Sequence, residues 1–202
     1  ATLARSSKMN RESGGTWPIN SYWIPRRYIV RNPFHVFLRA TNDVIRVFSA
    51  YQHRPVSGNV LKVIKREADI TFILGDATNL PLPANSIDYV ITDPPHTDET
   101  QFFELSVFYT SWMKRRLDFK NEFVVNPKQG KDLTKYFEMY AKFVLETQRV
   151  LKPDRYFTVI LHEENTGILK KCLEITENVG FSFYKSDRVN NFYIFTFLNK
   201  KA

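Results

Sequence analysis

The chain has few of the residues that build metal sites and disulfides. Of its 202 residues, one is cysteine and 4 are histidine. A single cysteine excludes an internal disulfide, and these scattered residues form no zinc-ligand cluster, so no metal site is expected. Long apolar runs and a signal-peptide pattern are missing too, which argues against a membrane span and makes the cytoplasm the expected location.

Glycine is also scarce, at 7 residues. No two glycines form a Gly-x-Gly turn between a predicted strand and a predicted helix, and the adjacent Gly14 and Gly15 lie in a polar, unpatterned stretch. Such a turn lets backbone amides approach a bound cofactor, because glycine has no side chain in the way. The chain is therefore expected to lack that part of a cofactor site.

Acidic residues are nearly absent from the first 60 positions, where nine Lys or Arg and two Asp or Glu give +7 of the net charge of +8. Such an excess favours an anionic partner, so Arg26, Arg27 and Arg31 are candidate phosphate contacts for DNA or RNA. Aromatic residues beside them could stack on bases, but we favour their packing on the domain. A helix predicted at 33–51 has an apolar face of Val36, Phe37, Ala40, Val44, Val47 and Phe48.

The rest of the sequence has the content of a packed α/β domain. Hydrophobic residues make up 43% and aromatic residues 15% of the chain, which excludes general disorder. We expect a basic, aromatic arm with its helix at 1–60 and an α/β part at 61–202. Strands are predicted at 70–74, 87–92, 156–161, 181–185 and 192–198, and helices at 137–150 and 168–179.

The segment Asp93-Pro94-Pro95-His96, which directly follows the strand predicted at 87–92, is the most informative feature. The Asp93 carboxylate can accept a hydrogen bond from an exocyclic amine. The Pro94 carbonyl can accept a second, because Pro94 fixes its own φ and Pro95 keeps it extended. Two such acceptors orient a poorly nucleophilic amine without covalent catalysis. The alternative is a plain Pro-Pro strand ending, which is common.

These residues resemble the Asp-Pro-Pro-aromatic signature of class I methyltransferases that modify exocyclic amines, with histidine at the aromatic position. Gly75-Asp76-Ala77 resembles motif III of that family, and Leu151-Lys152-Pro153 resembles the turn before its fifth strand. The resemblance implies a Rossmann-like α/β sheet with helices on both faces and S-adenosylmethionine as cofactor. It further implies that Asp76, with Ala77, contacts the cofactor and that His96 stacks on an extruded base.

A second segment, residues 97–106, narrows the subfamily. It resembles the stretch Asp-Glu-x-Gln-Tyr-x-Glu-Leu-Ser that follows the catalytic loop in adenine-specific DNA methylases. The resemblance implies methyl transfer to adenine N6 in DNA, or to cytosine N4. The alternative is an ordinary amphipathic helix, and we expect most of its aromatic residues to lie in the core: Phe102, Phe103, Tyr109 and Trp112.

The family also has a glycine-rich motif I and a central first strand, and the chain matches neither. The sheet is therefore expected to be incomplete, with an exposed edge and apolar face. A second polypeptide, or an N-terminal region outside this sequence, would carry motif I. Other functions stay open: guanine N2 methylation of transfer RNA, and non-catalytic nucleic-acid binding. Protein glutamine methylation is disfavoured by Asp93, because that group uses Asn-Pro-Pro-Tyr.

Overall fold

A computed structural model describes residues 32–50, 55–162 and 165–200. The chain divides into two compact units, which we describe separately. Unit 1 consists of Ala1–Val56 and Phe102–Arg116, and unit 2 consists of Ser57–Gln101 and Leu117–Ala202. The candidate phosphate contacts Arg26, Arg27 and Arg31 lie outside the described residues.

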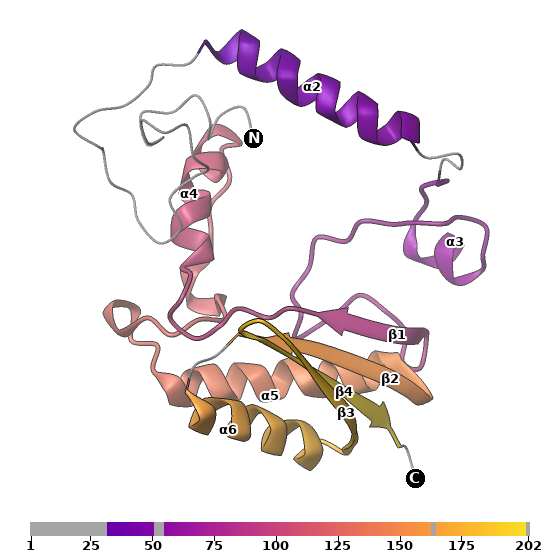
Figure 1. Cartoon of the computed structure of the whole chain (residues 1–202), viewed down its shortest axis with the longest axis vertical. Coiled ribbons are helices and arrows are strands. Elements are labelled where there is room, and N and C mark those ends of the chain that lie inside the picture. The colour runs from indigo at the N-terminus through magenta and orange to yellow at the C-terminus, as the bar shows by residue number, and fades with distance from the viewer. Residues whose placement is uncertain (1–31, 51–54, 163–164, 201–202) are drawn as a thin grey trace. The chain divides into compact units, whose positions relative to one another are not determined.

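Unit 2 contains a four-stranded mixed sheet with the strand order β1-β2-β4-β3 (Figure 1). The strands are β1 (Ile87–Thr92), β2 (Leu151–Leu161), β3 (Phe181–Val189) and β4 (Phe192–Asn199). β1 and β2 are parallel, whereas β4 is antiparallel to both of its neighbours, β2 and β3. A parallel pair needs a long crossover, which here contains α5 (Leu133–Val150). This arrangement confirms the predicted α/β class and the closing antiparallel pair.

One face of the sheet is covered by α5 and by α6 (Thr166–Asn178), as Figure 1 shows. The Asp132 side chain caps α5 by accepting a hydrogen bond from the Lys135 backbone N–H. Tyr140 of α5, Phe157 of β2 and Phe197 of β4 are fully buried in the core between the layers. Burial raises the pKa of the Tyr140 hydroxyl well above its usual range. The predicted helices at 137–150 and 168–179 therefore form and make the core.

Within the described part of unit 2, the opposite face is largely open. Tyr89 and Ile91 of β1 and Tyr184 of β3 are 50%, 65% and 56% exposed. The Tyr89 hydroxyl lies 2.5 Å from Thr158 Oγ1, which places Tyr89 on the side of β2 opposite to the core residues Phe157 and Val159. Within the described part of unit 2, helices cover one face and β1 pairs on one side only. The sheet is incomplete, as predicted.

The strand predicted at 70–74 does not form. Ile70 makes a single parallel bridge with Ser57, and Phe72 and Leu74 are 87% and 89% exposed. A strand obtains its hydrogen bonds from a neighbour, and no strand lies beside this segment in the described residues. The β-branched and aromatic composition was therefore a wrong sign of sheet pairing. The short helix α3 (Val60–Ile64) precedes this segment.

Unit 1 contains α2 (Pro33–Ala50) and α4 (Phe102–Trp112). Of the predicted inner face of α2, Val36 is buried, whereas Phe37, Val44, Val47 and Phe48 are more than half exposed. Packing of that whole face is therefore a wrong prediction.

The aromatic residues of α4 also differ from the expectation. Phe102 and Trp112 are 50% and 70% exposed, so neither lies in a core, and the Tyr109 side chain is outside the described set. None of the helices in the described ranges is long and apolar enough to cross a bilayer.

Candidate functional site

The Asp-Pro-Pro-His segment begins a loop, residues 93–99, at the carboxyl end of β1. Thr92, the last residue of β1, pairs with Val159 of the parallel strand β2, so His162, just after β2, lies at the same edge of the sheet. Carboxyl ends of parallel strands are the usual place for ligand sites in α/β folds. The sheet thus brings together two segments that are more than 60 residues apart in the sequence.

The His96 side chain is folded back onto its own loop. Its Nε2 lies 3.0 Å from Asp93 Oδ1, and its Nδ1 accepts a hydrogen bond of 3.2 Å from the His162 backbone N–H. Since Nδ1 is an acceptor, the proton belongs on Nε2, which donates to Asp93. The His96 side chain is 15% exposed, against 56% for Asp93. Stacking of His96 on a base stays a prediction.

A second imidazole–carboxylate pair lies beside the first. His162 Nδ1 is 3.0 Å from Glu99 Oε2. The His162 ring also packs on Phe192 of β4, with centroids 4.9 Å apart, and meets the His96 ring edge-on at 5.8 Å. Sequence reasoning missed Glu99 and His162. The available signal was position, because His162 directly follows the strand predicted at 156–161.

Three hydrogen bonds, from α5, from Val125 and from within the loop, hold the backbone of the 93–99 loop. Buried Tyr136 of α5 donates its hydroxyl to the Pro95 carbonyl at 2.8 Å. The Val125 N–H donates to the Thr97 carbonyl at 2.8 Å, and the Glu99 N–H closes a turn onto the His96 carbonyl at 3.0 Å. The loop is therefore fixed at three successive carbonyls that follow Pro94.

Two acceptors of this loop are left uncommitted. No described residue donates a hydrogen bond to Asp93 Oδ2 or to the Pro94 carbonyl. These are the two acceptors that the sequence predicts for an incoming amine, and the surrounding contacts hold Asp93 Oδ1 and the Pro95 carbonyl instead. Two acceptors on adjacent residues are thus without a donor among the described residues.

A buried polar layer supports the loop from residues 117–131. The Gln101 amide donates to the Val125 carbonyl and accepts from the Asn126 amide, both at 2.9 Å. Asn126 and Lys131 exchange two backbone hydrogen bonds around the 3₁₀ turn Pro127–Gln129. Buried Lys131 also donates to the Phe119 carbonyl. A polar layer of this kind, with its members hydrogen-bonded to one another, fixes a single loop conformation.

Asp76, the predicted cofactor contact, lies in a separate exposed turn. Its Oδ1 accepts hydrogen bonds of 2.8 Å from both the backbone N–H and the hydroxyl of Thr78. Ala77 is exposed in the same turn. No described hydrogen bond or ion pair joins this turn to the 93–99 loop. The structure therefore leaves the role of Asp76 and Ala77 as a prediction.

The ion pair Glu146–Arg149 of α5 binds the backbone of Leu80, at the end of that turn, and we call this contact the Glu146–Arg149 clamp. Glu146 Oε1 accepts from the Leu80 N–H at 2.6 Å, while Arg149 Nη2 bonds both Glu146 Oε1 at 2.6 Å and the Leu80 carbonyl at 3.1 Å. The hydrogen bonds from Arg149, helped by the Leu80 N–H, hold the pKa of Glu146 below its usual range. Arg149 in turn has a raised pKa because of Glu146.

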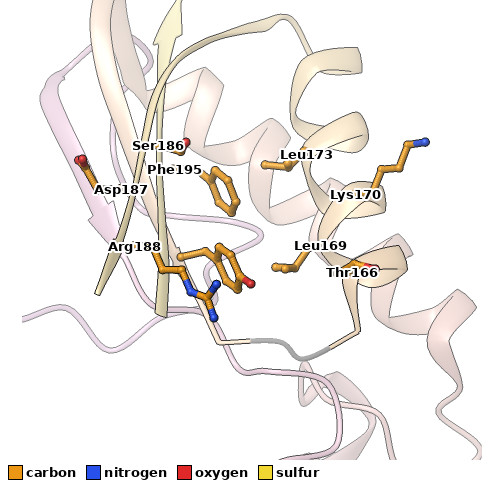
Figure 2. A pocket seen from close by; sticks show the side chains of 9 residues that line it. Thr166, Leu169, Lys170, Leu173, Ser186, Asp187, Arg188 and Phe195 are labelled. Carbon is orange, nitrogen blue, oxygen red and sulfur yellow. The ribbon is translucent and has the colours of Figure 1, made fainter. Parts of the chain in front are cut away.

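Unit 2 also has a mainly apolar groove of about 460 Å³ between α6 and the β3–β4 hairpin. Figure 2 shows Leu169 and Leu173 of α6 facing Phe195 of β4, with Lys170 directed outward. The Arg188 guanidinium lies 4.9 Å from the centroid of the Tyr193 ring at the rim. None of the predicted site residues lines this groove. In the described ranges no group of three or more His, Cys, Asp or Glu side chains could hold a metal ion.

No family model and no curated protein matches the chain. Among solved structures, a Thermus thermophilus protein named as a candidate DNA modification methylase, complexed with S-adenosyl-L-methionine, is 13% identical with a TM-score of 0.41. That match covers 64% of this chain and 55% of the other. An S-adenosylmethionine-dependent methyltransferase of Methanosarcina mazei is 11% identical with a TM-score of 0.37, covering 63% of this chain and 66% of that one.

The antibiotic-resistance methyltransferase Kmr is 11% identical with a TM-score of 0.36, over 64% of this chain and 57% of that one. The chain thus spans less than two thirds of the length of these three structures. Identities and scores this low leave cofactor, activity, substrate and partners to be proposed from the chain's own residues.

Proposed function

We propose that the chain is the amine-binding part of an S-adenosylmethionine-dependent methyltransferase that acts on an exocyclic amine of a nucleic-acid base, with adenine N6 in DNA as the first choice. One observation carries the proposal: Asp93 Oδ2 and the Pro94 carbonyl are both uncommitted among the described residues, on a loop whose next three carbonyls are taken. Two acceptors match the two N–H donors of an amino group.

The mechanism follows from these two acceptors. An exocyclic amine is a weak nucleophile because its lone pair is delocalised into the ring. Hydrogen bonds from its two N–H groups to Asp93 Oδ2 and the Pro94 carbonyl fix the direction of that lone pair and favour the positive charge that grows on nitrogen during attack. The amine keeps both protons while the new N–C bond forms and the methyl–sulfur bond of S-adenosylmethionine would break. The methylated nitrogen is then positively charged and readily gives one proton to water or to Asp93, so the site needs no strong general base.

The residues of this chain account for only part of a cofactor site. Asp76 presents an exposed carboxylate whose Oδ2 receives no hydrogen bond from a described residue, and in the proposal this oxygen contacts the cofactor, beside Ala77. S-adenosylmethionine would supply the methyl group. The glycine-rich turn that would hold the rest of the cofactor is missing from the sequence. The proposal therefore includes a second polypeptide, or a longer form of this chain, that provides this turn.

Among the described residues, one edge of β1 has no neighbouring strand, and the side chains of Tyr89 and Ile91 are exposed. Both features support such a partner, because an open edge and an apolar face favour pairing with further strands and helices. On the nucleic-acid side, Arg26, Arg27 and Arg31 are proposed to contact phosphates.

Calorimetry and a methyl-transfer assay test the proposal on the full chain and on its native assembly, isolated through an affinity tag on this chain. The assembly is expected to bind S-adenosylmethionine and to transfer its methyl group to DNA, with N6-methyladenine identified by mass spectrometry of the digested product. Transfer RNA serves as the parallel substrate. N2-methylguanine in the transfer RNA would identify guanine N2, in place of adenine N6, as the methylated amine. An assembly that neither binds the cofactor nor modifies any nucleic acid contradicts the enzyme proposal and favours a binding subunit.

A further inference from the structure

His96 lies between two groups that fix its orientation. The Nε2 side of the ring lies against Asp93 Oδ1 at 3.0 Å, and the Nδ1 side receives the His162 N–H at 3.2 Å. Both ring nitrogens are therefore in use, and the ring is mostly buried, with 15% of its side chain exposed. A residue held in this way is better suited to fixing a neighbour than to moving onto a ligand.

The neighbour that it fixes is the candidate catalytic carboxylate. A free aspartate side chain turns about χ1 and χ2, and its two oxygens exchange positions. The hydrogen bond from His96 Nε2–H occupies Oδ1 and leaves Oδ2 as the uncommitted oxygen. The Pro94 carbonyl, the second uncommitted acceptor, belongs to the same loop.

The His162 N–H that orients His96 is itself well supported. The His162 ring is bonded to Glu99 at 3.0 Å and packs on Phe192. Glu99 is tied to His96 through the turn in which the Glu99 N–H donates to the His96 carbonyl. Among the described residues, the charged and titratable groups in contact with the His96 ring are Asp93 and His162, and Glu99 reaches it through His162.

We propose that His96 is a positioning residue for Asp93: its Nε2–H holds Oδ1 so that Oδ2 and the Pro94 carbonyl point to the amine together. This inference rests on the proposed function and gives the histidine a role other than base stacking. A phenylalanine or tyrosine at this position could stack but would not place an N–H donor on Oδ1. The structure thus links the unusual fourth residue of the motif to the first.

The hydrogen-bond arrangement is tested first, without any activity, by ¹⁵N NMR of the histidine side chains of the full chain at neutral pH. We expect His96 to be a neutral Nε2–H tautomer, with Nδ1 unprotonated because it accepts from the His162 N–H. Asp93→Ala should leave this tautomer in place but shift the Nε2 and Hε2 resonances, because Nε2–H loses its acceptor. A neutral Nδ1–H tautomer, or Nε2 and Hε2 resonances that Asp93→Ala does not change, overturns the proposal.

The role in catalysis is tested with a matched pair of variants in the native assembly. His96→Gln retains an N–H donor at about the place of Nε2 but has no ring, whereas His96→Phe retains a ring face but has no donor. Positioning predicts that His96→Gln keeps kcat within about threefold of the wild type. His96→Phe should lose about 10- to 100-fold in kcat with little change in KM for DNA, the range expected for one hydrogen bond to a charged group.

The reverse ranking, with His96→Phe active and His96→Gln inactive, overturns the positioning role in favour of base stacking. Equal loss in both variants overturns it as well, because a donor at the right place would then not rescue the rate. Failure of the proposed function looks different: the wild-type assembly transfers no methyl group, although the NMR tautomer is as expected. In that case the catalytic role of His96 fails together with the proposed function.

Discussion

The two faces of the sheet in unit 2 differ in how far the chain itself completes them. The face under α5 and α6 contains fully buried Phe157 and Phe197, whereas the opposite face leaves Ile91 and Tyr184 more than half exposed. The same contrast holds for the two candidate ligand segments. The 93–99 loop is fixed by contacts from α5, from His162 just after β2 and from residues 117–131. The Asp76 turn has hydrogen bonds within itself and, at Leu80, the contact with Glu146 and Arg149. The contrast supports the proposal that this chain completes the amine side of the site and that a partner provides the cofactor side.

The largest expected effect comes from deleting a side chain on the covered face. Phe157→Ala should lower the free energy of unfolding by about 3–5 kcal/mol, because it opens a cavity in a close-packed core. Ile91→Ala on the open face should change it by no more than about 0.5 kcal/mol. Urea unfolding of both variants in the isolated chain measures the difference.

The same comparison is repeated in the native assembly. If the open face is the partner's binding surface, Ile91→Ala should weaken association there while leaving the isolated chain unchanged. A loss of about 2 kcal/mol or more in the isolated chain, as for a buried side chain, would show that this face is already covered, and the contrast between the two faces would then be wrong.

A smaller effect is expected from the support of the 93–99 loop. Tyr136→Phe removes the hydroxyl that donates to the Pro95 carbonyl and leaves this acceptor without its donor. The free energy of unfolding should fall by about 1–2 kcal/mol, and methyl transfer should decrease because the Pro94 carbonyl shifts with its neighbour. The mainly structural control is Tyr140→Phe, since the Tyr140 hydroxyl contacts Thr176 rather than the loop. Similar losses of transfer in both variants would argue against a specific role for Tyr136.

Sequence patterns predicted the parts of the fold that find their partners inside the chain. The strands β1 and β4 and the helices α5 and α6 formed close to the predicted positions, because each packs on another of the set. β2 and β3 formed but are longer than predicted: β3 continues to Val189, and β2 begins at Leu151, so the turn predicted at Leu151-Lys152-Pro153 is wrong and these residues belong to the strand. The segment at 70–74 and the apolar face of α2 have the same kinds of residues but lie largely exposed. Composition records what a segment can bury, and the neighbour that it would bury against is not encoded in the segment itself.

The site shows the same limit. Asp93 and Pro94 were predicted as site residues because four adjacent residues resemble a known motif. Glu99 and His162 were missed because their pairing depends on the parallel register of β1 and β2, which brings distant residues to one edge. The fold of His96 back onto Asp93 also escapes sequence reasoning, since it depends on the backbone N–H of His162.

The smallest expected effect concerns pH and the clamp on the Asp76 side. The pKa of Glu146 is lowered in the folded chain, so its charged form stabilises the fold above the unfolded pKa of about 4.3, and this contribution is lost as the pH falls through the lower folded value. Glu146→Gln should therefore lower the free energy of unfolding by about 1 kcal/mol at neutral pH. The difference from the wild type should shrink below about pH 4. Urea unfolding across this pH range measures it, and a difference that is constant with pH would exclude the charge as its source.

The central claim is that Asp93 holds the amine, and the most direct measurement is methyl transfer by the native assembly carrying Asp93→Ala, compared with Asp88→Ala. Asp88 is an exposed carboxylate near the other end of β1, where Lys152 and Arg155 lower its pKa. Asp88→Ala is therefore the matched control, because it removes the same kind of side chain at the end of β1 away from the 93–99 loop. We predict that Asp93→Ala abolishes transfer while S-adenosylmethionine binding and the unfolding midpoint remain, and that Asp88→Ala retains transfer. Transfer at the wild-type rate by Asp93→Ala would contradict the account.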